Sequence, residues 1–158
     1  MRDALRLAVA ALFCVAAGCA QRGPAYPVFA ASAPPIAAGH ARLVVYRTLY
    51  TPPQDFTAKV AVDGTPVGAL LMGTWLFVDE PAGAHQLESP PWPTFYAFGN
   101  QLPTRPIEVF LPPGSTTFVS LSLASTAPVE VSLATVDPAQ AQSDLARALM
   151  APPLADLE

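Results

Sequence analysis

The fold is decided by residues 60–88, which read VAVDGTPVGALLMGTWLFVDEPAGAHQLE. Apolar and polar residues alternate at the start of this stretch, which is the period of a strand with one buried face. The pair Asp63–Gly64 is typical of a two-residue hairpin loop, because such a loop needs positive φ angles. Two further strand-like runs follow at 74–80 and 85–89, with a Pro/Gly turn between them. The stretch therefore predicts consecutive short strands joined by tight turns.

Similar alternating runs lie on both sides of this stretch, at 41–50, 105–111, 116–125 and 128–136. About seven short strands separated by turn residues are typical of an all-β protein, and predict an antiparallel β-sandwich over residues 41–150.

A different pattern begins at Asp137–Pro138, which predicts a helix start with Asp as the N-cap and Pro in the first turn. Ala141, Leu145 and Ala148 fall on one side of this helix, and Pro152 ends it. We therefore expect one short C-terminal helix, followed by a tail over residues 151–158.

The beginning of the chain has the pattern of a secretory signal. Arg2 and Arg6 precede an uncharged apolar run of about 14 residues, whereas a membrane-spanning helix needs about 20. The run ends in Ala16-Ala17-Gly18-Cys19, which resembles a bacterial lipobox. Residues 1–18 are therefore expected to be a lipoprotein signal peptide, with Cys19 becoming the lipidated N-terminus. The alternative is ordinary cleavage after Ala20, which would release a soluble periplasmic protein.

The lipid anchor predicts a place in the cell. Ala20 follows Cys19 where an Asp would favour the inner membrane, so by resemblance to proteobacterial lipoproteins we expect outer-membrane anchoring with the domain in the periplasm. Residues 19–40 are rich in Ala, Pro and Gly without a clear period. They are interpreted as the lipidated end and a disordered linker, with Val28, Phe29 and Ile36 as candidates for contact with the domain.

Composition excludes several classes of function. The net charge is −4 and no basic patch or basic helix is present, which argues against nucleic-acid binding. The chain has 19 prolines, which disfavours a helix-rich fold. Both cysteines lie in the first 20 residues, so an intrachain disulfide in the mature domain is excluded. We expect no metal and no cofactor.

The motifs resemble domain-of-unknown-function family 2846, whose members are mostly bacterial secreted proteins and lipoproteins. The first strand ends in Tyr46-Arg47, and the hairpin has the form Asp-Gly-x-x-Val-Gly over residues 63–68. A Gly-x-aromatic-x-aromatic-x-x-x-Pro-x-Gly-x-His pattern follows over residues 73–85. The resemblance covers residues 41–149 and implies a β-sandwich without supplying a catalytic residue.

Residues 90–104 depart from the family pattern. This segment combines four prolines with four aromatic residues, Trp92, Phe95, Tyr96 and Phe98. Such a composition is incompatible with a regular central strand. Two interpretations stay open: the aromatic side chains plug an open end of the sandwich, or they form an exposed platform for a protein partner or a sugar ring.

The candidate catalytic residues are few and isolated. His85 opens a strand, and we expect it to bond to a turn carbonyl rather than to act as a ligand or base. His40 falls in the linker, and Ser115 lies in a Pro-Gly turn with no evident base. Asp79 and Glu80 are neighbours on a strand and point to opposite faces, so we interpret them as solvated turn acids.

Tyr46 and Arg47 also point to opposite faces of their strand. We expect Tyr46 to join the core and Arg47 to be exposed. Nucleophile motifs and phosphate-binding glycine loops are missing from the sequence. The expected function is therefore that of a non-catalytic accessory or protein-interaction module of the envelope. The alternative is a module that binds a glycan or small ligand through the aromatic loop.

Overall fold

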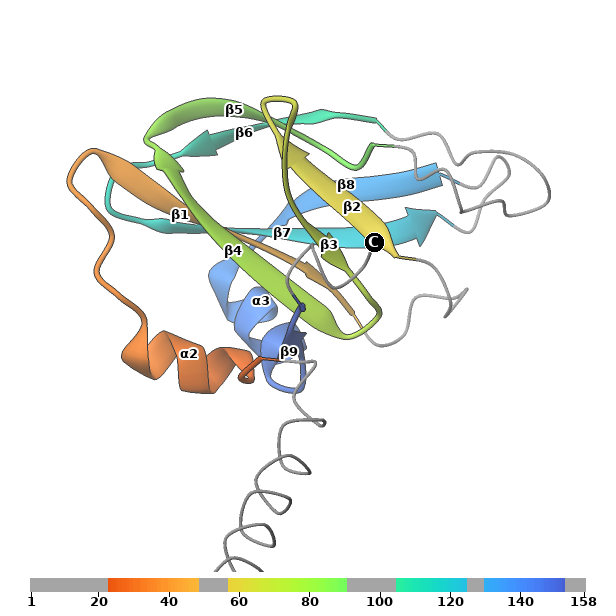
Figure 1. Cartoon of the computed structure of the whole chain (residues 1–158), viewed down its shortest axis with the longest axis horizontal. Helices are drawn as coiled ribbons and strands as arrows, with labels where there is room; N and C mark the ends of the chain where they lie inside the picture. The colour runs from red at the N-terminus through yellow and green to blue at the C-terminus, as the bar shows by residue number, and fades with distance from the viewer. Residues whose placement is uncertain (1–22, 49–56, 91–104, 125–129, 153–158) are drawn as a thin grey trace, which may run out of the picture.

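The computed structural model describes residues 23–48, 57–90, 105–124 and 130–152, and these form two β-sheets and two short helices. The four-stranded sheet has the order β3-β2-β5-β6, and the five-stranded sheet has the order β8-β7-β1-β4-β9. Figure 1 shows the two sheets stacked, with helices α2 and α3 on the face of the five-stranded sheet that points away from the four-stranded sheet. The predicted β-sandwich with a short C-terminal helix is confirmed.

The bounds of the strands agree closely with the alternating runs of the sequence. The four-stranded sheet consists of β2 (Ala58–Val62), β3 (Thr65–Leu70), β5 (Gly83–Glu88) and β6 (Ile107–Leu111). The five-stranded sheet consists of β1 (His40–Arg47), β4 (Thr74–Pro81), β7 (Thr116–Ala124), β8 (Glu130–Val136) and β9 (Leu149–Met150).

The five-stranded sheet is mixed, which corrects the expectation of an antiparallel sandwich in one respect. Strand β1 pairs antiparallel with β4 but parallel with β7, and β4 pairs parallel with β9. The chain leaves β4 for β5 and β6 in the other sheet and then returns through the turn after Leu111. This route brings β7 beside β1 in the same direction.

The hairpin between β2 and β3 is built as the sequence predicts. Asp63 and Gly64 have φ angles of 49° and 77°, which are the two left-handed positions of a type I′ turn. The turn is tied to β5, because the Asp63 N–H donates to the Gln86 carbonyl and the Gln86 N–H donates to the Asp63 carboxylate, both at 2.8 Å.

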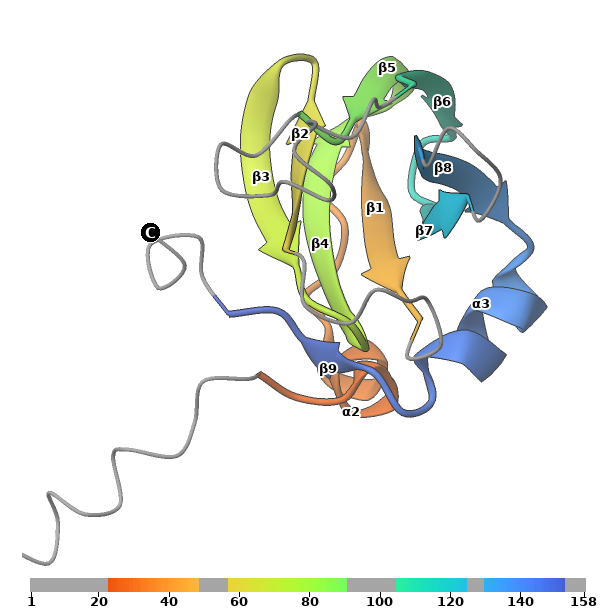
Figure 2. The same ribbon diagram turned by 90° about the vertical axis from the view of Figure 1, so that its right-hand side faces the viewer.

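Two hydrophobic cores lie on opposite faces of the five-stranded sheet. The larger core fills the space between the sheets and includes Leu43 and Val45 of β1. The second core lies between that sheet and the helices, and includes Val44 and Tyr46 of the same strand. Every residue from 41 to 47 is therefore buried, and the molecule has three layers (Figure 2).

Helix α3 (Pro138–Leu145) confirms the predicted C-terminal helix and its start, but it ends at Leu145 rather than at Pro152, and Leu149–Met150 form strand β9 instead. The Asp137 carboxylate accepts a hydrogen bond from the Ala139 N–H at 2.9 Å, and Pro138 occupies the first turn. Ala141 and Leu145 are fully buried and Ala148, just after the helix, is 3% exposed. The apolar side of the helix therefore closes the second core.

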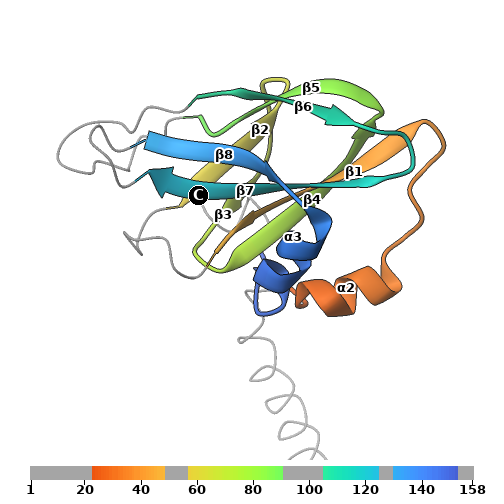
Figure 3. The same cartoon turned by 180° about the vertical axis from the view of Figure 1, so that it is seen from behind.

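Helix α2 (Tyr26–Ser32) corrects the prediction of a disordered linker for residues 23–39, whereas residues 19–22 lie outside the described part of the chain. Its side chains Tyr26 and Phe29 pack against the second core. Residues 23–39, here called the strap, run along the outer face of the five-stranded sheet before β1 begins (Figure 3). The contacts of these aromatic side chains offset the entropic cost of ordering this segment, whose composition alone does not predict an ordered structure.

The hairpin turn offers a direct test of the fold. Replacing Gly64 with Val is expected to destabilise the domain by about 1 kcal/mol or more, because a β-branched residue is strained at positive φ. An added Cβ at this position meets no atom within 4 Å, so the backbone alone causes the loss. Urea denaturation midpoints measure it. Gly64→Asn is the matched control, since Asn tolerates this conformation, and equal losses for both variants would contradict the turn.

Candidate functional site

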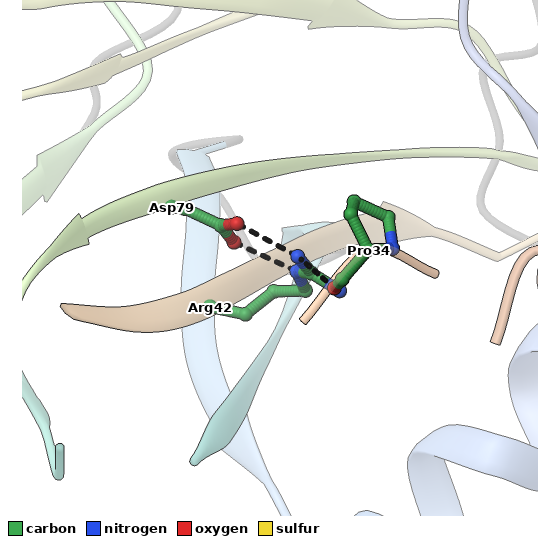
Figure 4. A network of polar contacts seen from close by, with 3 residues as sticks. All are labelled: Pro34, Arg42 and Asp79. Carbon is green, nitrogen blue, oxygen red and sulfur yellow. Dashed lines mark hydrogen bonds and ion pairs between the residues drawn. The ribbon is translucent and has the colours of Figure 1, made fainter. Parts of the chain in front are cut away.

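A bidentate ion pair between β1 and β4 contacts the strap. Arg42 and Asp79 are direct partners in the strand register. The Arg42 Nε and Nη2 atoms donate to the two Asp79 carboxylate oxygens, each at 2.7 Å. Arg42 Nη2 also donates to the Pro34 carbonyl of the strap at 3.1 Å (Figure 4). One guanidinium thus joins two strands and the strap.

Aromatic rings complete the environment of Arg42. Its guanidinium carbon lies 5.6 Å from the ring centre of Phe29 and 5.0 Å from that of Phe77, which is within the range of a cation–π contact. The hydrogen bond to Asp79 raises the pKa of Arg42, and Arg42 in turn lowers the pKa of Asp79. Both groups therefore stay charged over the physiological pH range. We call Arg42, Asp79, Phe29, Phe77 and the Pro34 carbonyl the strap latch.

The strap latch borders a cluster of aromatic rings. Trp75 is fully buried and contacts Tyr26 edge-on at 5.2 Å and Phe29 at 4.9 Å between ring centres. Among the described residues the buried Trp75 indole N–H has no hydrogen-bond partner, and the contacts seen there hold this ring by packing. Burial raises the pKa of the Tyr26 phenol. The cluster fixes α2 against the sheet.

A second polar contact fastens helix α3 to the same sheet. The Tyr46 hydroxyl donates to the Asp144 carboxylate at 2.7 Å, and the Gln140 amide donates to the other Asp144 oxygen at 2.8 Å. Burial, together with the hydrogen bond to Asp144, raises the pKa of Tyr46 well above its usual value. The phenol therefore remains a neutral donor, and its role is to position the helix.

His85 joins the β2–β3 turn to the β4–β5 turn. Its Nε2 lies 2.7 Å from the Pro81 carbonyl and its Nδ1 lies 2.7 Å from the Asp63 carboxylate. The predicted hydrogen bond between His85 and a turn carbonyl is thus confirmed. The other ring nitrogen contacts the Asp63 carboxylate. Two acceptors, one on each ring nitrogen, match the doubly protonated imidazolium.

The protonation of this pair follows from its contacts. Partial burial by itself would lower the pKa of His85, but the hydrogen bonds to Asp63 and Pro81 and the nearby negative charges outweigh it, so the pKa is raised. The hydrogen bond from the Gln86 N–H has the largest effect on Asp63 and lowers its pKa, and the hydrogen bond from His85 lowers it further. The pair is therefore most stabilising between these two pKa values.

Two strand residues differ from the expectations. Arg47 is fully buried rather than exposed, because its position on β1 faces the space between the sheets. Burial lowers its pKa to about 10. Asp79 is not a solvated turn acid: it lies within β4 and is paired with Arg42. Glu80 points to the opposite face of β4, so the two acids do not form a catalytic pair.

The remaining candidates have structural partners or lie outside the described residues. The Ser115 hydroxyl donates to the Pro112 carbonyl at 2.7 Å, and His40 Nδ1 lies 3.2 Å from the Ala38 carbonyl. Cys19 and the aromatic side chains Trp92, Phe95, Tyr96 and Phe98 belong to segments that the structure does not describe. The plug and platform interpretations of the loop therefore both stay open.

The described residues contain no group of three or more His, Cys, Asp or Glu side chains placed to hold a metal ion. Within the same ranges, none of the helices combines the length and apolar character required to cross a bilayer.

Sequence reasoning named Phe29 as a candidate contact with the domain, which the structure confirms, but it missed Arg42 and the role of Asp79. Two signals were present: Arg42 interrupts an apolar strand at an inward position, and Pro27 marks a helix start inside the Ala/Pro-rich segment. Neither indicates its partner, because Arg42 and Asp79 are 37 residues apart. With this geometry in view, comparison with known proteins finds no matching family model, curated protein or solved structure.

These contacts share one chemical character: each ties two segments of the chain together. The strap latch holds the strap to β1 and β4, Tyr46 holds α3, and His85 holds two turns. The hydrogen bonds that form these contacts are between 2.7 and 3.1 Å long, and the charged forms are stabilised where charge is needed. The arrangement can fix surfaces relative to one another.

The strap latch can be tested through Asp79. Asp79→Ala is expected to lower the free energy of unfolding by about 2 kcal/mol, because it leaves a buried guanidinium without its carboxylate. Proteolysis within residues 26–38 should accelerate, since the strap loses its fixed partner. Chemical denaturation and limited proteolysis measure the two effects. Glu80→Ala on the opposite face is the control, and equal effects of both variants would show that the latch holds nothing.

The His85–Asp63 pair predicts a pH dependence. A raised histidine pKa adds stability that is fully present below the unfolded value of about 6.5 and is lost as pH rises through the folded pKa. His85→Gln should therefore lower the urea midpoint more at pH 5.5 than at pH 9. Asp63→Asn should remove the same pH dependence, and a loss that is equal at both pH values would contradict the charged pair.

Proposed function

We propose that the chain is a lipid-anchored β-sandwich of the bacterial cell envelope that acts as a non-catalytic accessory or protein-interaction module. Cleavage before Cys19 and acylation of that residue attach the domain to the outer membrane, with its body in the periplasm. The proposed relationship to domain-of-unknown-function family 2846 rests on the motifs of residues 41–149 and agrees with this role.

The observation that carries the proposal is how few positions separate Cys19 from residues that are bonded to the sheet. The Gly23 N–H donates to the Met150 carbonyl at 3.2 Å, and the Met150 N–H donates to the Pro24 carbonyl at 3.0 Å. Gly23 stands four positions after Cys19. A lipid on Cys19 would therefore hold this sheet close to the membrane, which suits a protein that acts by its position.

The engagement of the polar side chains supports a non-catalytic role. A general base or nucleophile must be available to a substrate and must change its protonation state during the reaction. His85, Asp79 and Tyr46 instead hold segments of the fold at hydrogen-bond distances of 2.7 Å. Releasing any of them for chemistry would loosen a turn, the strap or a helix.

The four-stranded sheet, which lies on the side of the molecule opposite the helices, offers a surface for a protein partner. Strands β5 and β6 pair through Leu87 and Ile107, and the aromatic loop of residues 91–104 connects these two strands. On β6, Phe110 is 66% exposed. A large exposed aromatic residue on the strand that follows an aromatic-rich loop favours contact with another protein.

The proposal is tested in the envelope of a bacterium that expresses the full chain. Wild-type protein should incorporate labelled palmitate, and Cys19→Ser should remove the label and leave unprocessed precursor. A photoreactive residue at Phe95 or Phe110 should then capture a defined protein. The control position is Gln142, which is exposed on α3 in the helix layer.

Each outcome bears on one part of the proposal. Wild-type protein that never takes up palmitate contradicts the lipid anchor and favours cleavage after Ala20. Capture of a glycan without protein at Phe95 supports the alternative ligand-binding role. Equal capture from Gln142, or none from either test position, contradicts a specific interaction surface.

A further inference from the structure

The strap is uncharged along its whole length and most of it faces solvent. Residues 23–39 contain no Asp, Glu, Lys, Arg or His in a chain of net charge −4. Its exposed residues are Pro24, Pro27, Val28, Ala30, Ala31, Ser32, Pro34, Pro35, Ala37, Ala38 and Gly39. Val28 is 63% exposed, and it and Phe110 are the two large hydrophobic side chains exposed in the described part of the chain. This surface is apolar and has no charge to attract a charged partner.

The strap also lies at the end of the domain where the chain enters it. Gly23 is fixed against β9, because its backbone is hydrogen bonded to Met150 and a Cβ at this position would lie 2.8 Å from the Met150 Cβ. Helix α2 starts three residues later. Figures 1 and 3 show α2 and β9 on one side of the molecule and strands β5 and β6 on the other.

The length of the connection to Cys19 limits where this end can go. Four residue steps reach at most about 14 Å when fully extended. Glycerol-linked acyl chains on Cys19 place that residue at the surface of the bilayer. Gly23 is therefore confined to within about 14 Å of Cys19 at the bilayer surface, and the strap that begins there is held close to the membrane.

We propose that the exposed face of the strap, around Pro27, Val28 and Ala31, rests on the lipid headgroups, so that the four-stranded sheet and Phe110 point away from the membrane. This inference rests on the proposed lipid anchor. Because the acyl chains already hold the domain at high effective concentration, the strap needs little affinity of its own. An uncharged apolar surface suffices to set the orientation, and it avoids repulsion between carboxylates and anionic lipids.

The strap latch gives the orientation its rigidity. Arg42 ties the strap to β1 and β4 through the Pro34 carbonyl and Asp79, and Phe29 packs on Trp75. A strap that rests on the bilayer therefore fixes the tilt of both sheets. The partner surface proposed on β5, β6 and the connecting loop then faces the periplasm.

The test measures the distance of two positions from the bilayer in the full, processed protein. Val28→Cys and Phe110→Cys replace exposed residues, so neither is expected to impair folding. Acylation consumes the Cys19 thiol and Cys14 leaves with the signal peptide, so each variant carries one free thiol for a fluorophore. The labelled proteins are reconstituted in phosphatidylethanolamine/phosphatidylglycerol vesicles that contain a headgroup-attached quencher.

Quenching at position 28 should exceed that at position 110 several-fold. An insertion of about 12 Gly/Ser residues between Arg22 and Gly23, which adds about 20 Å of average reach, should reduce quenching at position 28 to the level at 110. Equal quenching at the two positions without the insertion overturns the orientation, whereas quenching at 28 that still exceeds quenching at 110 after the insertion supports it and shows that the strap contacts lipid by its own affinity. Palmitate incorporation is measured on the same samples: its absence contradicts the lipid anchor itself, whereas its presence with equal quenching contradicts the orientation alone.

Discussion

The burial of strand β1 on both faces is the constraint on which the rest of the structure depends. A β-sandwich strand normally has one face in the core and one in solvent, whereas every residue from 41 to 47 is buried here. The outer face of the five-stranded sheet therefore needs a cover. Helices α2 and α3 supply it from the two ends of the chain, and the second core they enclose is as necessary as the one between the sheets.

The same constraint explains the strong polar contacts. An arginine on a strand that is covered on both faces must have its charge satisfied within the protein. At Arg42 the carboxylate of Asp79, the Pro34 carbonyl and two aromatic rings do this. Tyr46, on the same face, meets the same need with Asp144 of α3. Each covering segment is thus held by packing and by one directional polar contact that sets its register.

The strands, the β2–β3 turn and helix α3 could be predicted from the sequence because their signals are local. Alternation, the Asp63–Gly64 pair and the Asp137 cap each act within a few residues. Helix α2 has only seven residues, too few for stability on its own, and depends on contacts with β1 and β4. The strap latch and the His85–Asp63 pair likewise join residues far apart in sequence, so the pattern of a single chain does not indicate them. The burial of Arg47 was missed for a related reason: nothing local shows which face of β1 meets the second sheet.

The two ends of the described chain also protect an edge of the sheet. Strand β9 covers the side of β4, and the backbone of Gly23, Pro24 and Ala25 bonds to β9 in turn. An uncovered β4 would present unpaired backbone groups to other strands. The segment 23–25 thus completes the sheet that it leads into, and these residues cannot move independently of the sandwich.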